Sequence, residues 1–128
     1  MENLTIKETK STPAINFDGI SGQLAIAGES YPENSYEFYK PLLNWIARFA
    51  AHHKGPIVLN CHISYLNTGS TKSMMEVFDL LEERFQQGSI VTVNWHCDSE
   101  NDRAIETAED FMEDVTFPFN IKSSTSSS

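Results

Sequence analysis

Apolar and polar residues alternate along several short stretches of this chain, which predicts β-strands there. The clearest stretch is 57–63, where four alternate positions are apolar: Ile57, Leu59, Cys61 and Ile63. The other predicted strands are 15–17, 23–27, 90–96 and 117–121. The first two of these form a hairpin around Asp18-Gly19. Pro118 places the last strand at a sheet edge, because proline has no N–H to donate to a central ladder.

Apolar residues spaced three and four apart predict three helices between these strands. The first begins at its N-cap Asn34, with Glu37 three positions on. Pro41 lies either in the first turn of a helix that starts later or at a kink in one that starts at Asn34. The second helix ends at Gly88, and the third begins near residues 98–99. The expected inward-facing residues are Phe38, Leu42, Trp45, Ile46 and Phe49, then Met74, Val77, Phe78, Leu81 and Phe85, then Ile105, Ala108, Met112 and Val115.

This alternation of strands and helices has no internal repeat and no linker, so it predicts a single two-layer α/β domain over residues 1–122. A chain of 128 residues with 40% hydrophobic residues is long enough to bury a real core. The serine-rich segment 123–128 is expected to be a disordered tail.

The charge balance narrows the range of partners. Eighteen acidic residues against nine Lys and Arg give a net charge of −9, so the chain repels a phosphate backbone and nucleic acid is not expected to bind. No apolar run approaches the roughly 20 residues of a membrane span, and residues 1–4 do not start a signal peptide. We expect a cytoplasmic protein without membrane insertion, in which Cys61 and Cys97 stay reduced.

Metal and catalytic signatures are weak. The pairs Cys61-His62 and His96-Cys97 suggest four ligands, but strand alternation places the cysteines and the histidines on opposite faces of the sheet. We therefore expect no metal site. There is no Gly-x-Ser-x-Gly, no phosphate loop and no His-Glu-x-x-His. The carboxylates of the third helix are spaced as a solvated face: Glu106, Glu109, Asp110 and Glu113.

Four hydroxyls directly follow the central strand, at the start of the second predicted helix. They belong to Thr68, Ser70, Thr71 and Ser73. A helix N-terminus has unsatisfied backbone N–H groups and a partial positive charge, so it can hold a phosphate that is either a ligand or attached to threonine or serine. Any of the first three hydroxyls can instead simply cap the helix. Lys72 would suit a nearby phosphate.

Several ordered motifs resemble the SiaC family of bacterial regulatory phosphoproteins, over about residues 9–121. They are residues 11–15 (Ser-Thr-Pro-Ala-Ile), 28–37 (Gly-Glu-Ser-Tyr-Pro-Glu-Asn-Ser-Tyr-Glu), 65–68 (Tyr-Leu-Asn-Thr) and 117–119 (Phe-Pro-Phe). The resemblance implies a STAS-like fold of the anti-sigma-factor-antagonist type, with a mixed sheet and helices packed mainly on one face. It also implies phosphorylation of Thr68, the threonine of the Tyr-Leu-Asn-Thr motif.

The resemblance further implies a non-enzymatic role without a cofactor. Family members are phosphorylated by a dedicated histidine-kinase-like serine/threonine kinase and restored by a metal-dependent serine/threonine phosphatase. The unmodified form binds and activates a diguanylate cyclase, which implies cyclic di-GMP signalling and control of biofilms or aggregation. The residues expected to contact partners surround Thr68: Tyr65, Leu66, Asn67, Gly69, Ser70, Thr71 and Lys72.

One position departs from the family pattern, in which a serine usually follows the phosphorylated threonine. This chain has Gly69 there, which is expected to loosen the turn and expose Thr68 further. Two other hypotheses remain open. In the second hypothesis, the chain is a STAS-like module that binds a small ligand or nucleotide. In the third, it is a small metal-dependent enzyme.

Overall fold

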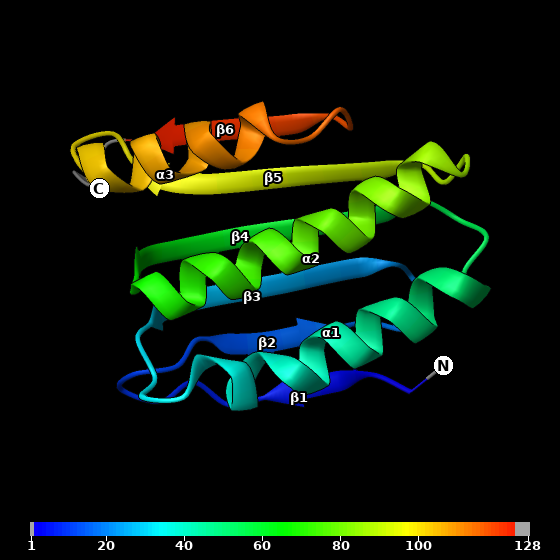
Figure 1. Ribbon diagram of the computed structural model, residues 1–128, viewed down its shortest axis with the longest axis horizontal. Coiled ribbons are helices and arrows are strands. Elements are labelled where there is room, and N and C mark those ends of the chain that lie inside the picture. Colours follow the sequence, from blue (N-terminus) through cyan, green and yellow to red (C-terminus); the bar gives the residue numbers. More distant parts are fainter. Residues whose placement is uncertain (1, 125–128) are drawn as a thin grey trace.

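The computed structural model describes residues 2–124 and contains one six-stranded sheet whose strands lie side by side in sequence order (Figure 1). The strands are β1 (Leu4–Ile6), β2 (Ala14–Phe17), β3 (Gln23–Ser30), β4 (Ile57–Leu66), β5 (Val91–Asp98) and β6 (Phe119–Ser124). The pairs β1–β2 and β2–β3 are antiparallel, and β3 to β6 are parallel. The predicted mixed sheet is confirmed.

Three helices connect the parallel strands: α1 (Ser35–His52), α2 (Thr68–Gln86) and α3 (Asp102–Glu113). All three cover the same face of the sheet (Figure 1). This follows from the strand order, because each crossover moves to the next strand in the same direction and such crossovers are right-handed. The predicted two-layer arrangement is therefore confirmed.

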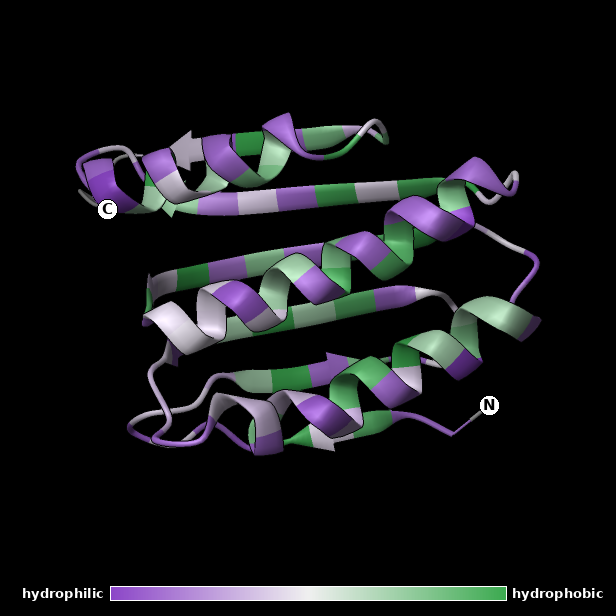
Figure 2. Cartoon of the chain, in the orientation of Figure 1, coloured by the Kyte–Doolittle hydropathy of each residue, from purple (hydrophilic) through white to green (hydrophobic). Residues whose placement is uncertain are grey.

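The core lies between the sheet and these helices, and the strands alternate apolar and polar residues along their length (Figure 2). The predicted inward stripes of α1 and α2 are confirmed as buried or packed against the core. The inward stripe predicted for the third helix is confirmed for Ile105, Ala108 and Val115 and is wrong for Met112, which is 40% exposed. Phe111 is buried instead, with its ring 4.9 Å from that of Phe78 and 5.5 Å from that of Trp95.

The predicted boundaries differ from the structure mainly at the two ends of the chain. β1 was not predicted, and Ser123 and Ser124 complete β6 rather than opening a disordered tail. The rest of that predicted tail, residues 125–128, lies outside the described residues. α3 begins at Asp102, after a short turn, rather than at residues 98–99. Pro41 lies inside α1, which starts directly after Asn34.

The face of the sheet away from the helices carries a row of hydrogen-bonded amides. Asn60 donates to Gln23 at 3.3 Å, Asn94 donates to Asn60 at 3.1 Å, and Asn120 donates to Asn94 at 3.1 Å. We call this row the amide ladder; it crosses β3, β4, β5 and β6. Among the described residues, no helix is long and apolar enough to span a membrane.

The cysteines and histidines divide between the two faces as predicted. Cys61 and Cys97 are buried in the core, whereas His62 is exposed and His96 is half-buried, with their rings 6.4 Å apart. Within residues 2–124, no group of three or more His, Cys, Asp or Glu side chains is placed to hold a metal ion. Burial raises the pKa of the Cys61 thiol, since a thiolate would lack solvation there.

Candidate functional site

The N-termini of α1, α2 and α3 gather at one edge of the molecule, because each helix follows the carboxyl end of a parallel strand (Figure 1). Each helix is capped by an asparagine whose side-chain oxygen accepts the backbone N–H three residues on: Asn34 from Glu37 at 3.1 Å, Asn67 from Ser70 at 2.8 Å and Asn101 from Ala104 at 3.1 Å. The predicted cap of α1 is confirmed. This edge therefore concentrates three helix N-termini and their partial positive charge.

Asn67, and not one of the hydroxyls, caps α2. The alternative in which Thr68, Ser70 or Thr71 supplies the cap is therefore wrong, because an amide directly before the helix takes that position. Thr68 becomes the first residue of α2, and its side chain is exposed. Thr71 is half-buried, and its hydroxyl donates to the Asn67 carbonyl at 3.0 Å. Of these three hydroxyl residues, Thr68 is the exposed one.

Ser70 is a buried structural residue. Its exposed fraction is 0%, and its hydroxyl accepts a 2.7 Å hydrogen bond from Ser30. The Ser30 hydroxyl also lies 2.7 Å from the Tyr39 hydroxyl, so the three form a buried network that joins α2, β3 and α1. Burial raises the pKa of Tyr39 to about 12. The Ser70 side chain is therefore unavailable to a partner, and the expected contact surface does not include it.

Gly69 lies in the first turn of α2 and closely approaches the side chain of Ser35. A Cβ atom at Gly69 would lie 2.6 Å from the Ser35 hydroxyl and 3.1 Å from the Ser35 Cβ, so any side chain here would press on the first residue of α1. The backbone at Gly69 is helical. Asn67 ties the same two segments together, because its side-chain amide donates to the Pro32 carbonyl at 3.3 Å. Gly69 therefore lies within a helix and not in a turn, and its expected effect on the exposure of Thr68 stays a prediction.

The β4–α2 junction, residues 65–72, presents a mixed surface around Thr68. Tyr65 is 41% exposed, Lys72 is exposed, and Leu66 packs partly against the core. The Tyr65 ring lies 6.0 Å from the ring of Tyr31, and the Arg103 guanidinium carbon lies 6.0 Å from the Tyr65 ring. The structure thus brings the predicted Tyr65, Leu66, Thr68 and Lys72 together on one edge.

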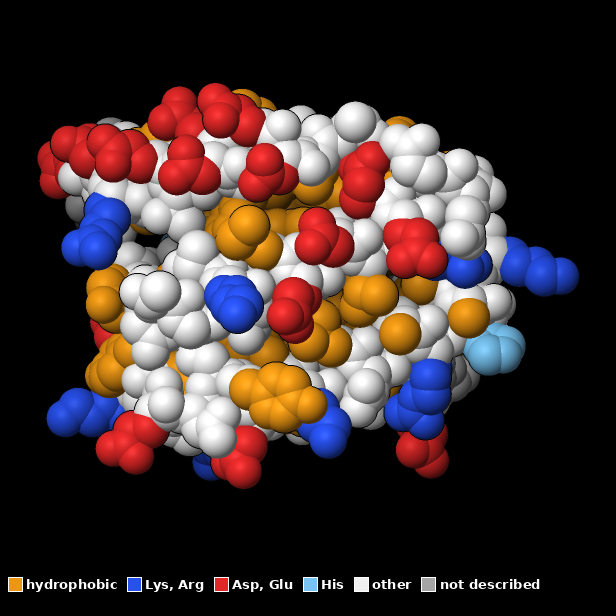
Figure 3. Space-filling view, viewed as in Figure 1, with side chains coloured by type: hydrophobic (Ala, Val, Ile, Leu, Met, Phe, Trp, Pro, Cys, Tyr) orange, Lys and Arg blue, Asp and Glu red, His pale blue; other side chains and the backbone are white. Residues whose placement is uncertain are grey.

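Sequence reasoning did not identify Arg103, which extends this surface. Arg103 is exposed in the first turn of α3, where a cation is unfavourable next to the positive end of the helix dipole. That mismatch was the available signal. Acidic side chains otherwise dominate α3 (Figure 3). Lys72 and Arg103 therefore place positive charge around the β4–α2 junction of a strongly acidic protein.

The fold and this edge define a small α/β domain with an exposed threonine at a helix N-terminus. A model of the SiaC family of regulatory phosphoproteins matches residues 6–124, and the chain therefore belongs to that family. The family resemblance noted in the sequence is confirmed.

Relatives in Pseudomonas aeruginosa match the chain over almost its whole length. An uncharacterized protein of strain UCBPP-PA14 is 48% identical over 122 residues, which is 95% of this chain and 97% of the relative. The structure of SiaC is 46% identical, with a TM-score of 0.91 over 97% of this chain and 100% of that one. In a crystal structure of the diguanylate cyclase SiaD with its activator SiaC, the matching chain is 47% identical. Its TM-score is 0.91 over 94% of this chain and 99% of that one.

Proposed function

We propose that this protein is a non-enzymatic regulator that is reversibly phosphorylated on Thr68 and whose unmodified form binds and activates a diguanylate cyclase. The exposure of Thr68 carries the proposal, since the hydroxyls of Ser70 and Thr71 are engaged within the fold. The complex of SiaC with the cyclase SiaD supports the choice of output partner. A cognate serine/threonine kinase and a metal-dependent phosphatase complete the proposed cycle in the cytoplasm.

The switch is electrostatic and local. A phosphate on Thr68 adds nearly two negative charges and several acceptor oxygens to the β4–α2 junction. The N-terminus of α2 and the Lys72 ammonium, one helical turn away, stabilise this charge. A partner that rests on the neutral junction must then desolvate the phosphate, which weakens the complex. The fold stays intact, because the buried contacts of Asn67 and Ser70 do not include the Thr68 side chain.

Binding of the cyclase to three forms of the protein tests the proposal. Titration calorimetry is run with the unmodified protein, the protein phosphorylated on Thr68 and the Thr68→Ala variant. We expect the unmodified and alanine forms to bind alike and the phosphorylated form to bind at least ~10-fold more weakly. Cyclase turnover should follow the same order. Equal affinity of the cyclase for all three forms would contradict the proposed switch.

A matched pair of charge variants separates a local effect from a general one. Thr68→Glu and Gln87→Glu each add one negative charge, at opposite ends of α2, and both positions are exposed. We expect Thr68→Glu to weaken the cyclase complex and Gln87→Glu to leave it unchanged. Peptide mapping of the kinase product completes the test. A phosphate found on Thr71 would show that the modified residue is not Thr68.

A further inference from the structure

A cavity of about 90 Å³ lies beside the β4–α2 junction, between the carboxyl end of β4 and the first turns of α3. Its lining includes Ser64, Tyr65, Leu66, Trp95, Arg103 and Thr107. Figure 3 shows a dark hollow on this side of the molecule, between α3 and the start of α2. Since a water molecule needs roughly 10–15 Å³ of such space, the cavity has room for a group of several atoms but not for a nucleotide.

Several polar groups of the cavity are engaged within the protein, and the Arg103 guanidinium is the donor that remains available. The Asn101 side chain donates to the Ser64 carbonyl at 3.1 Å and accepts from the Ala104 N–H, and the Thr107 hydroxyl donates to the Arg103 carbonyl at 2.9 Å. Arg103 contributes a guanidinium, which has donors and no acceptor. A guanidinium at the mouth of a cavity is complementary to a carboxylate.

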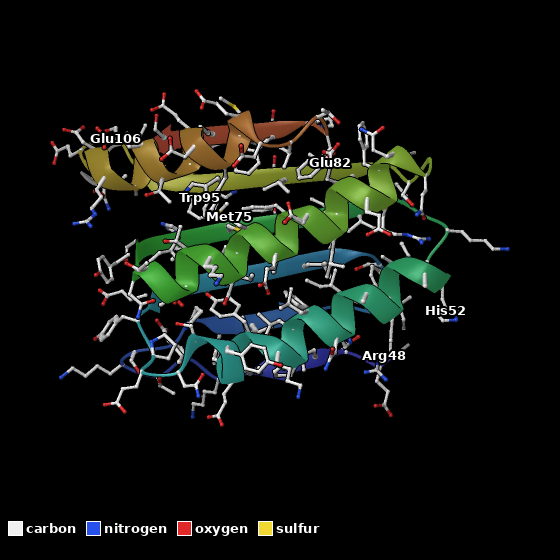
Figure 4. The ribbon with its side chains drawn as sticks, in the orientation of Figure 1. Arg48, His52, Met75, Glu82, Trp95 and Glu106 are labelled. Atoms are coloured by element: carbon white, nitrogen blue, oxygen red, sulfur yellow. The ribbon has the colours of Figure 1, made fainter. Side chains whose placement is uncertain are left out.

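Trp95 supplies a second, independent observation. It is fully buried on β5 between α2 and α3 (Figure 4), it lines the cavity, and its Nε1–H has no hydrogen-bond acceptor among residues 2–124. A buried donor of this kind is costly to leave unpaired. The other tryptophan differs, because the Trp45 Nε1–H donates to the Glu2 carbonyl at 2.9 Å.

We propose that this cavity receives an aspartate or glutamate side chain of the output partner, with Arg103 as its counter-charge. The proposal rests on the proposed function, because it takes the diguanylate cyclase as the partner. Leu66 and Tyr65 provide apolar walls for the methylene groups of that side chain. Lys72 and Arg103 favour an acidic contact at this edge, although the chain as a whole repels acidic proteins.

This occupant explains why one phosphate suffices as a switch. Leu66 lines the cavity and Thr68 lies two residues further along the same turn. A phosphate on Thr68 therefore repels an incoming carboxylate and competes with it for Lys72 and Arg103. An uncharged partner contact at the surface would lose much less affinity when Thr68 is phosphorylated.

Removal of one cation at either end of the molecule tests the proposal. Arg103→Gln removes the cavity cation, and Arg48→Gln removes an exposed cation near the opposite end of the molecule (Figure 4). We expect Arg103→Gln to weaken binding of the cyclase at least ~10-fold and Arg48→Gln to change it less than ~2-fold. Equal binding by both variants overturns the proposed docking while leaving the proposed function intact. A wild-type protein that does not bind the cyclase refutes both.

The two indole N–H resonances report the cavity directly. We expect the Trp95 signal, and not the Trp45 signal, to move when the cyclase binds, and to stay in place when the protein carries Arg103→Gln. Sodium acetate is the control ligand. If acetate moves the Trp95 signal saturably while Arg103→Gln leaves cyclase binding unchanged, the cavity binds free small acids and the proposed partner contact is wrong. A Trp95 signal that neither ligand moves also overturns the proposal.

Discussion

The hydroxyl of Ser30 donates a 2.7 Å hydrogen bond to the hydroxyl of Ser70, forty residues further along the chain. Both side chains are fully buried, and the bond fixes the first turn of α2 against the end of β3. Asn67 adds a second tie at the same level, since its backbone N–H donates to the Ser30 carbonyl at 2.9 Å. The exposed Thr68 is thus presented by a turn whose neighbours on both sides are anchored.

Loss of the Ser70 hydroxyl should weaken this anchor measurably. We expect Ser70→Ala to lower the free energy of unfolding by about 1–2 kcal/mol, because Ser30 loses one of its buried partners. Urea denaturation measures the change. Ser73→Ala, on the same helix and also buried, is the control and should cost less than about 0.5 kcal/mol. Equal costs would mean that the hydrogen bond adds nothing to side-chain burial.

Burial of the Tyr39 phenol should also make stability depend on pH in the alkaline range. The phenol of Tyr39 has a pKa of about 12 in the fold, against about 10 in an unfolded chain. The raised pKa favours the folded state fully below pH ~10, and this contribution is lost between pH ~10 and ~12 as the unfolded chain ionises first. The free energy of unfolding that is lost in this way is about 3 kcal/mol. In urea titrations from pH 8 to 11, Tyr39→Phe should lose stability with pH less steeply than wild type. Parallel plots of stability against pH for the two proteins would contradict the raised pKa of Tyr39.

The capping assignment predicts opposite sensitivities for two adjacent residues. Asn67→Ala should cost about 0.5–2 kcal/mol, because it removes the cap of α2 together with the contact to Pro32. Thr68→Ala should cost no more than about 0.5 kcal/mol, since Thr68 is exposed and does not cap the helix. Thermal unfolding of the two variants side by side decides the matter. A larger loss of stability for Thr68→Ala than for Asn67→Ala would show that the Thr68 hydroxyl caps the helix.

The cysteines should be replaceable without loss of function. Cys61 and Cys97 are buried on the core side of their strands, so alanine or valine at both positions should cost roughly 1–2 kcal/mol through packing alone. Binding of the cyclase should be unchanged. Metal analysis of protein purified without added zinc provides the check. Stoichiometric zinc that disappears on replacement of the cysteines would overturn this prediction.

Periodicity predicted the layers and most of the core because burial on one face of each element dominates this fold. It was wrong for Met112 on α3, because Phe111 and Met112 follow Ala108 at equally regular helical spacings, three and four residues on. Only packing decides between two such faces, and Phe111 buries an aromatic ring against Trp95. The short strand β1 was missed because Leu4 and Ile6 alone make too weak an alternation.

The structure changes several roles within the candidate site, because the sequence assigned them from side-chain chemistry alone. The four hydroxyls within residues 68–73 indicated a cap among themselves, whereas Asn67, an asparagine like the predicted cap Asn34, caps α2. Ser70 precedes Met74 by four residues and therefore continues the buried stripe of α2, a signal that the polar side chain concealed. The cavity beside Arg103 depends on how α3 lies over the sheet, which no local pattern predicts.

The sequential order of the strands has a consequence for synthesis of the chain. Each strand pairs with the strand made immediately before it, so no later segment has to insert between two that are already joined. During translation the sheet can grow outward from its N-terminal hairpin, one edge at a time. Once residue 88 has emerged, β4 and α2 are complete and only one growing edge is open. The turn that presents Thr68 can therefore be assembled before the last two strands join the sheet.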